Sequence, residues 1–184
     1  MRIVGGKFRG KKLVAPAHQG TRPTSDRARE TLFNILLHNP HLGPQVLLEK
    51  KVLDVFAGTG ALGLEAFSRG AETVSFIEND PAALKVLREN LKAFDGATSQ
   101  IFEEDAAHLS RSPMAPFDLI FLDPPYHQNL LVLSLENLYH KGWLADGAIV
   151  AMEMAKDEEI ILPSFLDFLF ERTSGAAKLV FCKL

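Results

Sequence analysis

The sequence predicts an α/β protein built around a Rossmann-like, mostly parallel sheet. From Lys51 onward, short apolar runs alternate with segments of helical apolar spacing, which implies right-handed crossovers between parallel strands. A glycine-rich turn links the first of these runs to the helix that follows it. The end of the chain differs, because two apolar runs are separated only by a short turn. This arrangement predicts an antiparallel hairpin at the edge of the sheet.

Length and composition fit one domain with a small basic extension. The chain has 184 residues, of which 47% are hydrophobic and 23% are charged, so it can bury a sizeable core. We expect a basic hairpin and helix at 1–40, followed by the main α/β domain at 41–184. Cys182 is the only cysteine, which excludes an intrachain disulfide, and we expect it to be a small apolar residue of the last strand.

Positive charge is concentrated near the start of the chain. Residues 1–29 contain eight Lys or Arg residues and one acid, which gives +7, whereas the remainder carries −10. A basic segment on an acidic domain favours a polyanionic partner such as nucleic acid; the alternative is a solvated tail that only keeps the protein in solution. The candidate RNA-binding residues are Arg2, Lys7, Arg9, Lys11, Lys12, Arg22 and Arg27.

The expected elements of this basic segment are two short strands and a helix. The segments 3–4 and 12–14 flank a glycine-rich turn and should pair with each other as two short strands. The helix begins near Asp26, whose carboxylate suits the positive end of the helix dipole, and it ends before Pro40. Its apolar face has the spacing i, i+4, i+7 and i+8, and consists of Ala28, Leu32, Ile35 and Leu36.

The remaining elements follow from apolar runs and helix caps. Parallel strands are predicted at 52–56, 73–77, 100–102, 117–122 and 148–152. Between the second and third of these, Asp80 should cap a helix that has Pro81 at its first position. The apolar face of that helix is Leu84, Leu87 and Leu91. The final hairpin is predicted at 166–172 and 178–183, joined at 173–175.

The segment 54–63 is a strand end, a glycine turn and the start of a helix. Gly58, Gly60 and Gly63 match G-x-G-x-x-G, which admits a nicotinamide or flavin dinucleotide as well as S-adenosylmethionine. A carboxylate at Asp54, four residues before Gly58, would repel a pyrophosphate. The same carboxylate could attract the α-ammonium and sulfonium groups of S-adenosylmethionine, so it favours that ligand.

Two further acids follow the next two strands and strengthen this choice. Glu78 could accept hydrogen bonds from both ribose hydroxyls, and Asp105 could accept one from the adenine amino group. No metal is expected, since His108, His127 and His140 have no paired ligand spacing. The candidate cofactor-binding residues are Asp54, Phe56, Ala57, Gly58, Thr59, Gly60, Glu78, Asn79, Asp105 and Ala106.

The stretch Asp123-Pro124-Pro125-Tyr126 supplies the candidate catalytic residues. Neither proline can donate to a sheet, so the strand before them must end at the edge where open α/β sheets bind ligands. The Asp123 carboxylate and the Pro124 carbonyl could accept from the N–H groups of an exocyclic base amine and restore its lone pair, while Pro125 fixes the turn. Tyr126 offers a ring on which a base that has left its stack could rest.

Four stretches carry a resemblance to a known family: 1–6 together with 9–10, 22–34, 53–66 and 123–126. Over nearly its whole length the chain resembles the bacterial 16S ribosomal RNA guanine-N2 methyltransferases of the small-subunit methyltransferase D type. The resemblance implies a class I methyltransferase fold, S-adenosylmethionine as methyl donor, and one guanine of 16S RNA in an assembling small subunit as target. It assigns the cofactor to Asp54, Gly58, Gly60 and Glu78, and the base to residues 123–126.

Three alternatives remain open at this point. An adenine-N6 methyltransferase acting on DNA or RNA would use Asp123-Pro124-Pro125-Tyr126 equally well, because both targets are planar exocyclic amines. A dinucleotide oxidoreductase would fit the glycine turn, and a non-enzymatic RNA-binding or assembly factor would fit the basic segment. The preference for guanine comes only from the resemblance. We also expect a cytoplasmic protein, since the sequence has no apolar run of membrane-spanning length. Its expected oligomeric state is a monomer.

Overall fold

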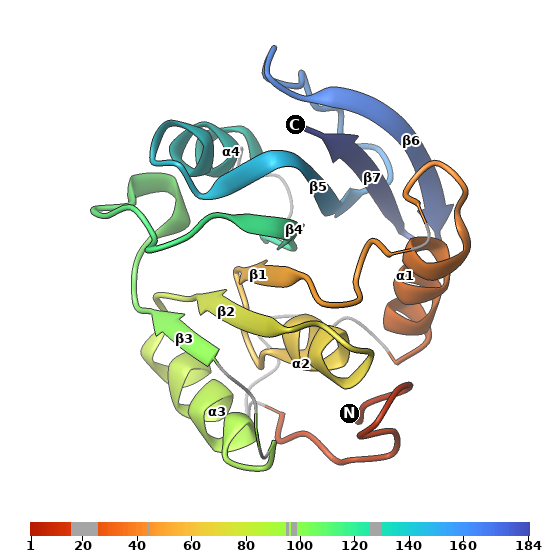
Figure 1. The fold of residues 1–184 in the computed structure, drawn as a ribbon, viewed down its shortest axis with the longest axis vertical. Helices are drawn as coiled ribbons and strands as arrows, with labels where there is room; N and C mark the ends of the chain where they lie inside the picture. Colours follow the sequence, from red (N-terminus) through yellow and green to blue (C-terminus); the bar gives the residue numbers. More distant parts are fainter. Residues whose placement is uncertain (16–25, 44, 95, 97–98, 126–129) are drawn as a thin grey trace.

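Seven strands form one sheet with helices on both of its faces (Figure 1). The computed structural model describes residues 1–15, 26–43, 45–94, 96, 99–125 and 130–184. In these residues the strand order is β3-β2-β1-β4-β5-β7-β6, with β1 to β5 parallel and β7 antiparallel to both of its neighbours. The predicted sheet with an antiparallel hairpin at its edge is confirmed. None of the helices in this part of the chain is long and apolar enough to cross a membrane.

The elements follow one another in the order that the sequence pattern predicts. They are α1 (Asp26–His38), β1 (Lys51–Val55), α2 (Ala61–Ser68), β2 (Thr73–Ile77), α3 (Pro81–Leu91), β3 (Ser99–Phe102), the 3₁₀ turn η1 (Ala106–His108), β4 (Phe117–Leu122), α4 (Leu130–His140), β5 (Leu144–Ala155), β6 (Asp167–Ser174) and β7 (Ala177–Lys183). Strands β2 and β4 occupy the predicted residues. Strand β5 begins earlier than predicted, because Asp146 and Gly147, which are typical of a turn, lie inside an irregular stretch of the strand.

Alternate side chains of the central strands face two separate cores. Val52 and Phe121 belong to the cluster that also contains the buried side chains of α1 and α2, whereas Leu53 and Ile120 belong to the cluster that contains those of α4. Both faces of the sheet are therefore covered, as a parallel sheet requires. Cys182 on β7 is fully buried, and this burial raises the pKa of its thiol to about 12, which confirms it as an apolar residue of the last strand.

Residues 1–15, called the arm below, form a turn rather than the two short strands expected from the sequence. Arg2 and Lys12 form an isolated antiparallel bridge. The Ile3 N–H donates to the Lys11 carbonyl at 2.9 Å, and the Gly10 N–H donates to the Ile3 carbonyl at 2.8 Å. The predicted pairing is present, but only as this single bridge. Strands do not form because residues 5–10, which lie between the paired positions, make up the turn.

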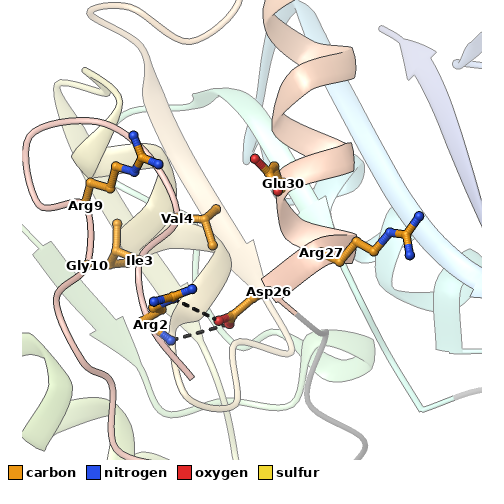
Figure 2. A pocket seen from close by; sticks show the side chains of 8 residues that line it. All are labelled: Arg2, Ile3, Val4, Arg9, Gly10, Asp26, Arg27 and Glu30. Carbon is orange, nitrogen blue, oxygen red and sulfur yellow. Dashed lines mark hydrogen bonds and ion pairs between the residues drawn. The ribbon is translucent and has the colours of Figure 1, made fainter.

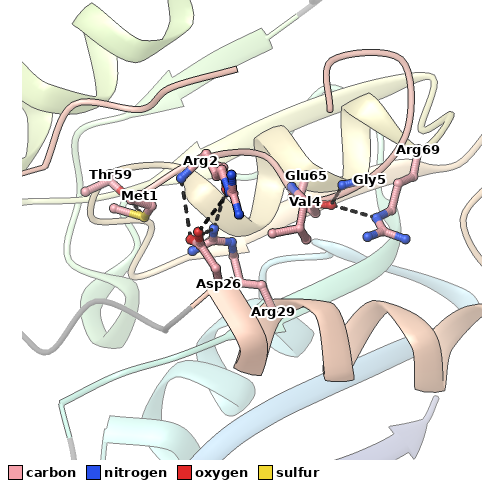
Figure 3. A network of polar contacts seen from close by, with 9 residues as sticks. All are labelled: Met1, Arg2, Val4, Gly5, Asp26, Arg29, Thr59, Glu65 and Arg69. Carbon is pink, nitrogen blue, oxygen red and sulfur yellow. Dashed lines mark hydrogen bonds and ion pairs between the residues drawn. The ribbon is translucent and has the colours of Figure 1, made fainter. Parts of the chain in front are cut away.

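The arm is held on the last turns of α2 by buried polar groups (Figure 3). The Glu65 carboxylate, which is fully buried, accepts from the N–H groups of Val4 and Gly5, each at 2.8 Å. The Ser68 hydroxyl accepts from the Phe8 N–H at 2.9 Å and donates to the Gly5 carbonyl at 2.6 Å. Apolar side chains of the arm join the same cluster as α1 and α2. The boundary at residue 40 between an appendage and the main domain stays a prediction.

A second polar group ties the arm to the start of α1. The Arg29 side chain is fully buried, and its Nη2 donates to Asp26 Oδ1 at 2.7 Å and to the Arg2 carbonyl at 2.6 Å. Burial alone would raise the pKa of Asp26, but the hydrogen bond and positive charge of Arg29 outweigh it and lower that pKa. Arg29 is therefore a structural cation, although it contributes to the positive charge counted from the sequence.

Replacing Gly6 with alanine should distort the packing of the arm against α2. Gly6 has a φ of 75°, and a Cβ atom there would lie 1.9 Å from the Ser68 carbonyl oxygen. Left-handed backbone costs alanine roughly 1–2 kcal/mol, and the overlap adds a similar amount. We expect Gly6→Ala to lose roughly 2–4 kcal/mol of unfolding free energy in urea titrations.

Gly10→Ala is the matched control for this prediction. Gly10 has a φ of 85°, but a Cβ atom there would meet nothing within 4 Å, so only the backbone cost applies. The Gly10 variant should therefore lose clearly less than the Gly6 variant. Equal losses would contradict the close approach of the arm to α2.

Candidate active site

The site lies where neighbouring parallel strands end at one edge of the sheet. Val55 at the end of β1 pairs with Ile77 at the end of β2 on one side and with Leu122 at the end of β4 on the other. The segments that follow these three strands therefore begin next to one another. Open α/β sheets bind ligands at this carboxyl edge, so the structure brings the candidate cofactor and base residues to the expected place.

Asp54 closes the turn between β1 and α2 from inside the protein. Its side chain is 2% exposed, and its Oδ2 accepts from the Gly63 N–H at 2.8 Å. Burial raises the pKa of this carboxyl well above its ordinary value, the charges of Asp123 and Glu78 raise it further, and the Gly63 hydrogen bond opposes the rise. Asp54 thus fixes the start of α2, and a cation bound nearby would favour its charged form.

The glycine turn combines backbone strain with close packing. Phe56, although it is not a glycine, has a φ of 62°, and Gly58 and Gly60 have φ values of 55° and 76°. A Cβ atom on Gly60 would lie 2.4 Å from Leu87, and one on Gly63 would lie 2.5 Å from the Phe76 ring. At Gly58 the nearest atom would be 3.9 Å away, so space remains beside the backbone there. Two glycines therefore serve packing, and Gly58 leaves room for a ligand.

Glu78 connects the glycine turn to the start of α3. Its Oε2 accepts from the Gly58 N–H at 2.7 Å, and its Oε1 accepts from the N–H groups of Asn79 and Asp80 at 2.9 and 2.8 Å. Asp80 caps α3 by accepting from the Ala83 N–H at 2.7 Å, as predicted. Oε1 uses both of its lone pairs in these bonds, but Oε2 retains one, through which the carboxylate can still accept from a ligand. Asn79 contributes its backbone N–H here and its side chain is exposed.

Asp105 and Ala106 form the turn that follows β3. Asp105 Oδ1 accepts from the Ala107 N–H at 2.9 Å, and its Oδ2 lies 2.9 Å from His108 Nδ1. The His108 hydrogen bond, followed by that of Ala107, lowers the pKa of Asp105. Asn137 on α4 donates to the Ala107 carbonyl at 2.7 Å and holds this turn. Ala106 is buried. No group of three acidic, His or Cys side chains in the described ranges is arranged to hold a metal ion.

The candidate catalytic residues begin directly after β4. The strand ends at Leu122, as the two prolines predict. Asp123 is half-buried, Pro124 is buried and Pro125 is exposed. Tyr126 lies outside the described residues. Asp123 is close enough to Asp54 for its charge to raise the pKa of that buried carboxyl.

The candidate RNA-binding cations form two groups on the arm and α1. Arg2, Arg9 and Arg27 line a hollow of about 470 Å³ between the arm and the first turn of α1, together with the carboxylates of Asp26 and Glu30 (Figure 2). Within it, Arg2 Nε lies 3.6 Å from Asp26.

The second group of cations lies around an aromatic ring of the arm. The Nζ atoms of Lys7 and Lys11 lie 5.3 and 5.1 Å from the centre of the Phe8 ring. Lys12 is exposed beside the bridge to Arg2. Arg22 is outside the described residues.

Sequence reasoning missed two buried polar residues near the site. Glu65 on α2 binds the arm, and Asn90 on α3 is bonded to both the arm and the glycine turn. The available signal was weak: each is a polar residue at a helix position where its neighbours are apolar. Glu65 has one local partner, Arg69, but the bonds to the arm and to the glycine turn join residues 31 to 76 positions apart, so local spacing could not have identified them.

The strand order, the glycine turn and the antiparallel hairpin define the fold of a class I methyltransferase. A family model described as Conserved hypothetical protein 95 matches residues 1–183. The Haemophilus influenzae protein named Ribosomal RNA small subunit methyltransferase D is 36% identical, over 95% of this chain and 89% of that protein. The chain therefore belongs to this family, that of the small-subunit ribosomal RNA methyltransferase D proteins.

Solved structures agree with this assignment. The Escherichia coli protein yhhF is 34% identical to this chain with a TM-score of 0.83, and the match covers 100% of this chain and 97% of that one. The Thermus thermophilus 16S rRNA N2 G1207 methyltransferase RsmC is 22% identical with a TM-score of 0.63, covering 91% of this chain and 45% of that one. The second likeness concerns the fold alone.

Asp54→Asn should flatten the dependence of stability on pH. Burial raises the pKa of Asp54 in the folded protein, whereas the unfolded chain ionises near its ordinary pKa of about 3.9. The stabilisation that this shift provides is complete below the unfolded pKa and is lost as pH rises through the folded pKa. Asparagine keeps an acceptor for the Gly63 N–H and has no proton to lose. The unfolding free energy of the variant relative to the wild type should therefore increase from about pH 4 towards neutrality.

Urea titrations at a series of pH values measure this difference. Asp157→Asn is the matched control, because it makes the same change in an exposed turn. Its stability should follow the wild type at every pH. Parallel curves for the wild type and Asp54→Asn would contradict a raised pKa at Asp54.

Proposed function

We propose that this protein transfers a methyl group from S-adenosylmethionine to the exocyclic N2 amine of a guanine in 16S RNA of the small ribosomal subunit. The observation that carries the proposal is the alignment of Asp54 in the end of β1, Glu78 after β2 and Asp105 after β3 with Asp123 after β4, at one edge of the sheet. The name of the Haemophilus influenzae relative supports small-subunit ribosomal RNA as the class of substrate.

S-Adenosylmethionine fits the charge and the space at this edge. The turn offers room beside Gly58, and Glu78 places negative charge next to that room, while a cationic ligand there would favour the charged form of the buried Asp54 and a pyrophosphate would oppose it. The donor carries an α-ammonium and a sulfonium and no phosphate, so these acids attract it. Glu78 would accept from a ribose hydroxyl through the remaining lone pair of Oε2, and Asp105 would accept from the adenine amino group. A dinucleotide would meet the same acids unfavourably.

Asp123 and the Pro124 carbonyl would activate the base. In guanine the lone pair of the exocyclic nitrogen is delocalised into the ring, which makes the amine a poor nucleophile. Acceptors directed at its N–H groups favour a tetrahedral nitrogen and return the lone pair to it. S-Adenosylmethionine would supply the methyl group to this nitrogen, and the electron pair of the carbon–sulfur bond would leave with the neutral thioether. Asp123 or water would accept the proton that the alkylated, positively charged nitrogen must lose.

The arm and α1 would hold the RNA backbone. Asp26 and Glu30 offset part of the positive charge at the hollow, but Arg9 and Arg27 are exposed at it and would contact phosphates, and the exposed lysines of the arm extend the positive surface. The target base must leave its stack to reach Asp123. We propose that the enzyme acts as a monomer in the bacterial cytoplasm on subunits that are still being assembled.

Asp123→Ala should separate catalysis from cofactor binding. It removes an acceptor that acts on the base, so labelled methyl transfer onto small subunits from cells lacking the enzyme should fall about 10²- to 10³-fold or more. Binding of S-adenosylmethionine, measured by calorimetry, should stay within about twofold, because Asp54 and Glu78 are unchanged. Asp157→Ala, in an exposed turn, is the control and should transfer normally. Normal turnover by Asp123→Ala would refute the mechanism.

Neutralising Lys7, Arg9, Lys11 and Lys12 with glutamine should weaken RNA binding and reduce its salt dependence. Each lost phosphate contact lowers the slope of log K against log salt by about 0.7 to 0.9. Filter binding over a range of salt concentrations measures that slope. The matched control neutralises four cations of the C-terminal half, Lys141, Lys156, Arg172 and Lys183, and should keep the wild-type slope. An unchanged slope in the arm variant would remove the role given to the arm.

A further inference from the structure

Asn90 is a buried amide that joins two separate segments of the chain. Asn90 lies on α3, and only 2% of its surface is exposed. Its Oδ1 accepts from the Val14 N–H at 2.7 Å, and its Nδ2 donates to the Val14 carbonyl at 3.1 Å and to the Thr59 carbonyl at 2.9 Å. Both of its donor hydrogens and its acceptor are therefore used, and each bond would be costly to leave unmade in this buried place.

On one side, Asn90 fixes the glycine turn that faces the cofactor. The peptide between Thr59 and Gly60 is held at both of its polar atoms, because Asn90 binds its carbonyl and the Ala57 carbonyl accepts from its N–H at 2.7 Å. This peptide directly follows Gly58, where the backbone leaves room for a ligand. Its orientation therefore decides the shape of the turn against which the cofactor would lie.

On the other side, Asn90 holds the end of the arm. Val14 follows the lysines of the arm closely in sequence, and both of its backbone polar groups bind Asn90. The start of the arm also reaches the turn, since Met1 Sδ lies 3.9 Å from the Thr59 hydroxyl and the Met1 carbonyl accepts from the Leu13 N–H at 3.1 Å (Figure 3). Thr59 is thus in contact with the arm directly and through Asn90.

We propose that Asn90 is a positioning residue that couples the arm to the glycine turn, so that RNA on the arm and S-adenosylmethionine in the turn strengthen each other's binding. This inference rests on the proposed function. A ligand that orders either segment also orders the other through the shared amide, so the second ligand loses less conformational entropy when it binds. The coupling is reciprocal, and effects of this kind are typically fivefold or more in affinity.

The test compares cofactor affinity with and without RNA. Equilibrium dialysis gives the Kd of labelled S-adenosylhomocysteine, the unreactive product of the donor, alone and with saturating small subunits from cells lacking the enzyme. In the wild type the subunits should lower this Kd at least about fivefold. In Asn90→Asp the ratio of the Kd measured without subunits to the Kd measured with them should approach one. The carboxylate still accepts from the Val14 N–H, but it cannot donate to the carbonyls of Thr59 and Val14.

A second pair of variants keeps the test valid if Asn90→Asp does not fold. Val14→Pro removes the N–H that donates to Asn90 Oδ1 and leaves both Asn90 donors with their carbonyl partners, so it should reduce the coupling without removing the group that binds Thr59. Val14→Ala keeps the N–H and removes a side chain that is 49% exposed, so it should keep the wild-type ratio. A purely structural role for Asn90 would change the melting temperature and leave the ratio unchanged.

The outcomes separate this inference from the proposed function. If the wild type transfers methyl groups but its Kd is indifferent to subunits, the coupling is refuted and the proposed function stands. Retention of the ratio in Asn90→Asp or Val14→Pro would also refute it, because the coupling would then run elsewhere. A wild type that neither binds S-adenosylhomocysteine nor transfers methyl groups would remove the proposed function itself.

Discussion

The hydrogen bond from the Gly63 N–H to the buried Asp54 carboxylate fixes how α2 leaves the sheet, and both halves of the site depend on that direction. At its first residues α2 completes the glycine turn that faces the cofactor. At its last residues Glu65 and Ser68 bind the backbone of the arm. One short helix therefore sets the distance between the cofactor edge and the surface that carries the basic residues. A shift of its start would displace both.

Local chemistry made much of the fold predictable. Two prolines must end β4 after Leu122, and Asp80 before Pro81 must begin a helix, because each signal acts within a few residues. Long-range contacts were not predictable. Glu65 and Asn90 lie on the buried faces of their helices, and the arm and turn segments that they bind are far away in the chain. The start of β5 was misplaced for a related reason, since Asp146 and Gly147 look like a turn until the neighbouring strand is present.

The positive charge at the start of the chain has two different roles in the structure. Arg29 is buried against Asp26, and Arg2 contacts the same carboxylate. Part of the positive charge counted from the sequence therefore holds the arm against the start of α1. Arg9, Lys7 and Lys12 are exposed and remain candidates for phosphate contacts. A sequence gives the number of cations, but only the packing shows which of them face solvent.

The proposed function requires that the methyl group be attached to the exocyclic N2 atom of a guanine. Small subunits from cells lacking the enzyme can be treated with the pure protein and labelled S-adenosylmethionine, and their RNA digested to nucleosides for mass spectrometry. Methyl transfer to guanine N2 gives N2-methylguanosine as the labelled nucleoside. Labelled N6-methyladenosine would contradict the choice of base, and the absence of any labelled nucleoside would contradict the assignment as an RNA methyltransferase.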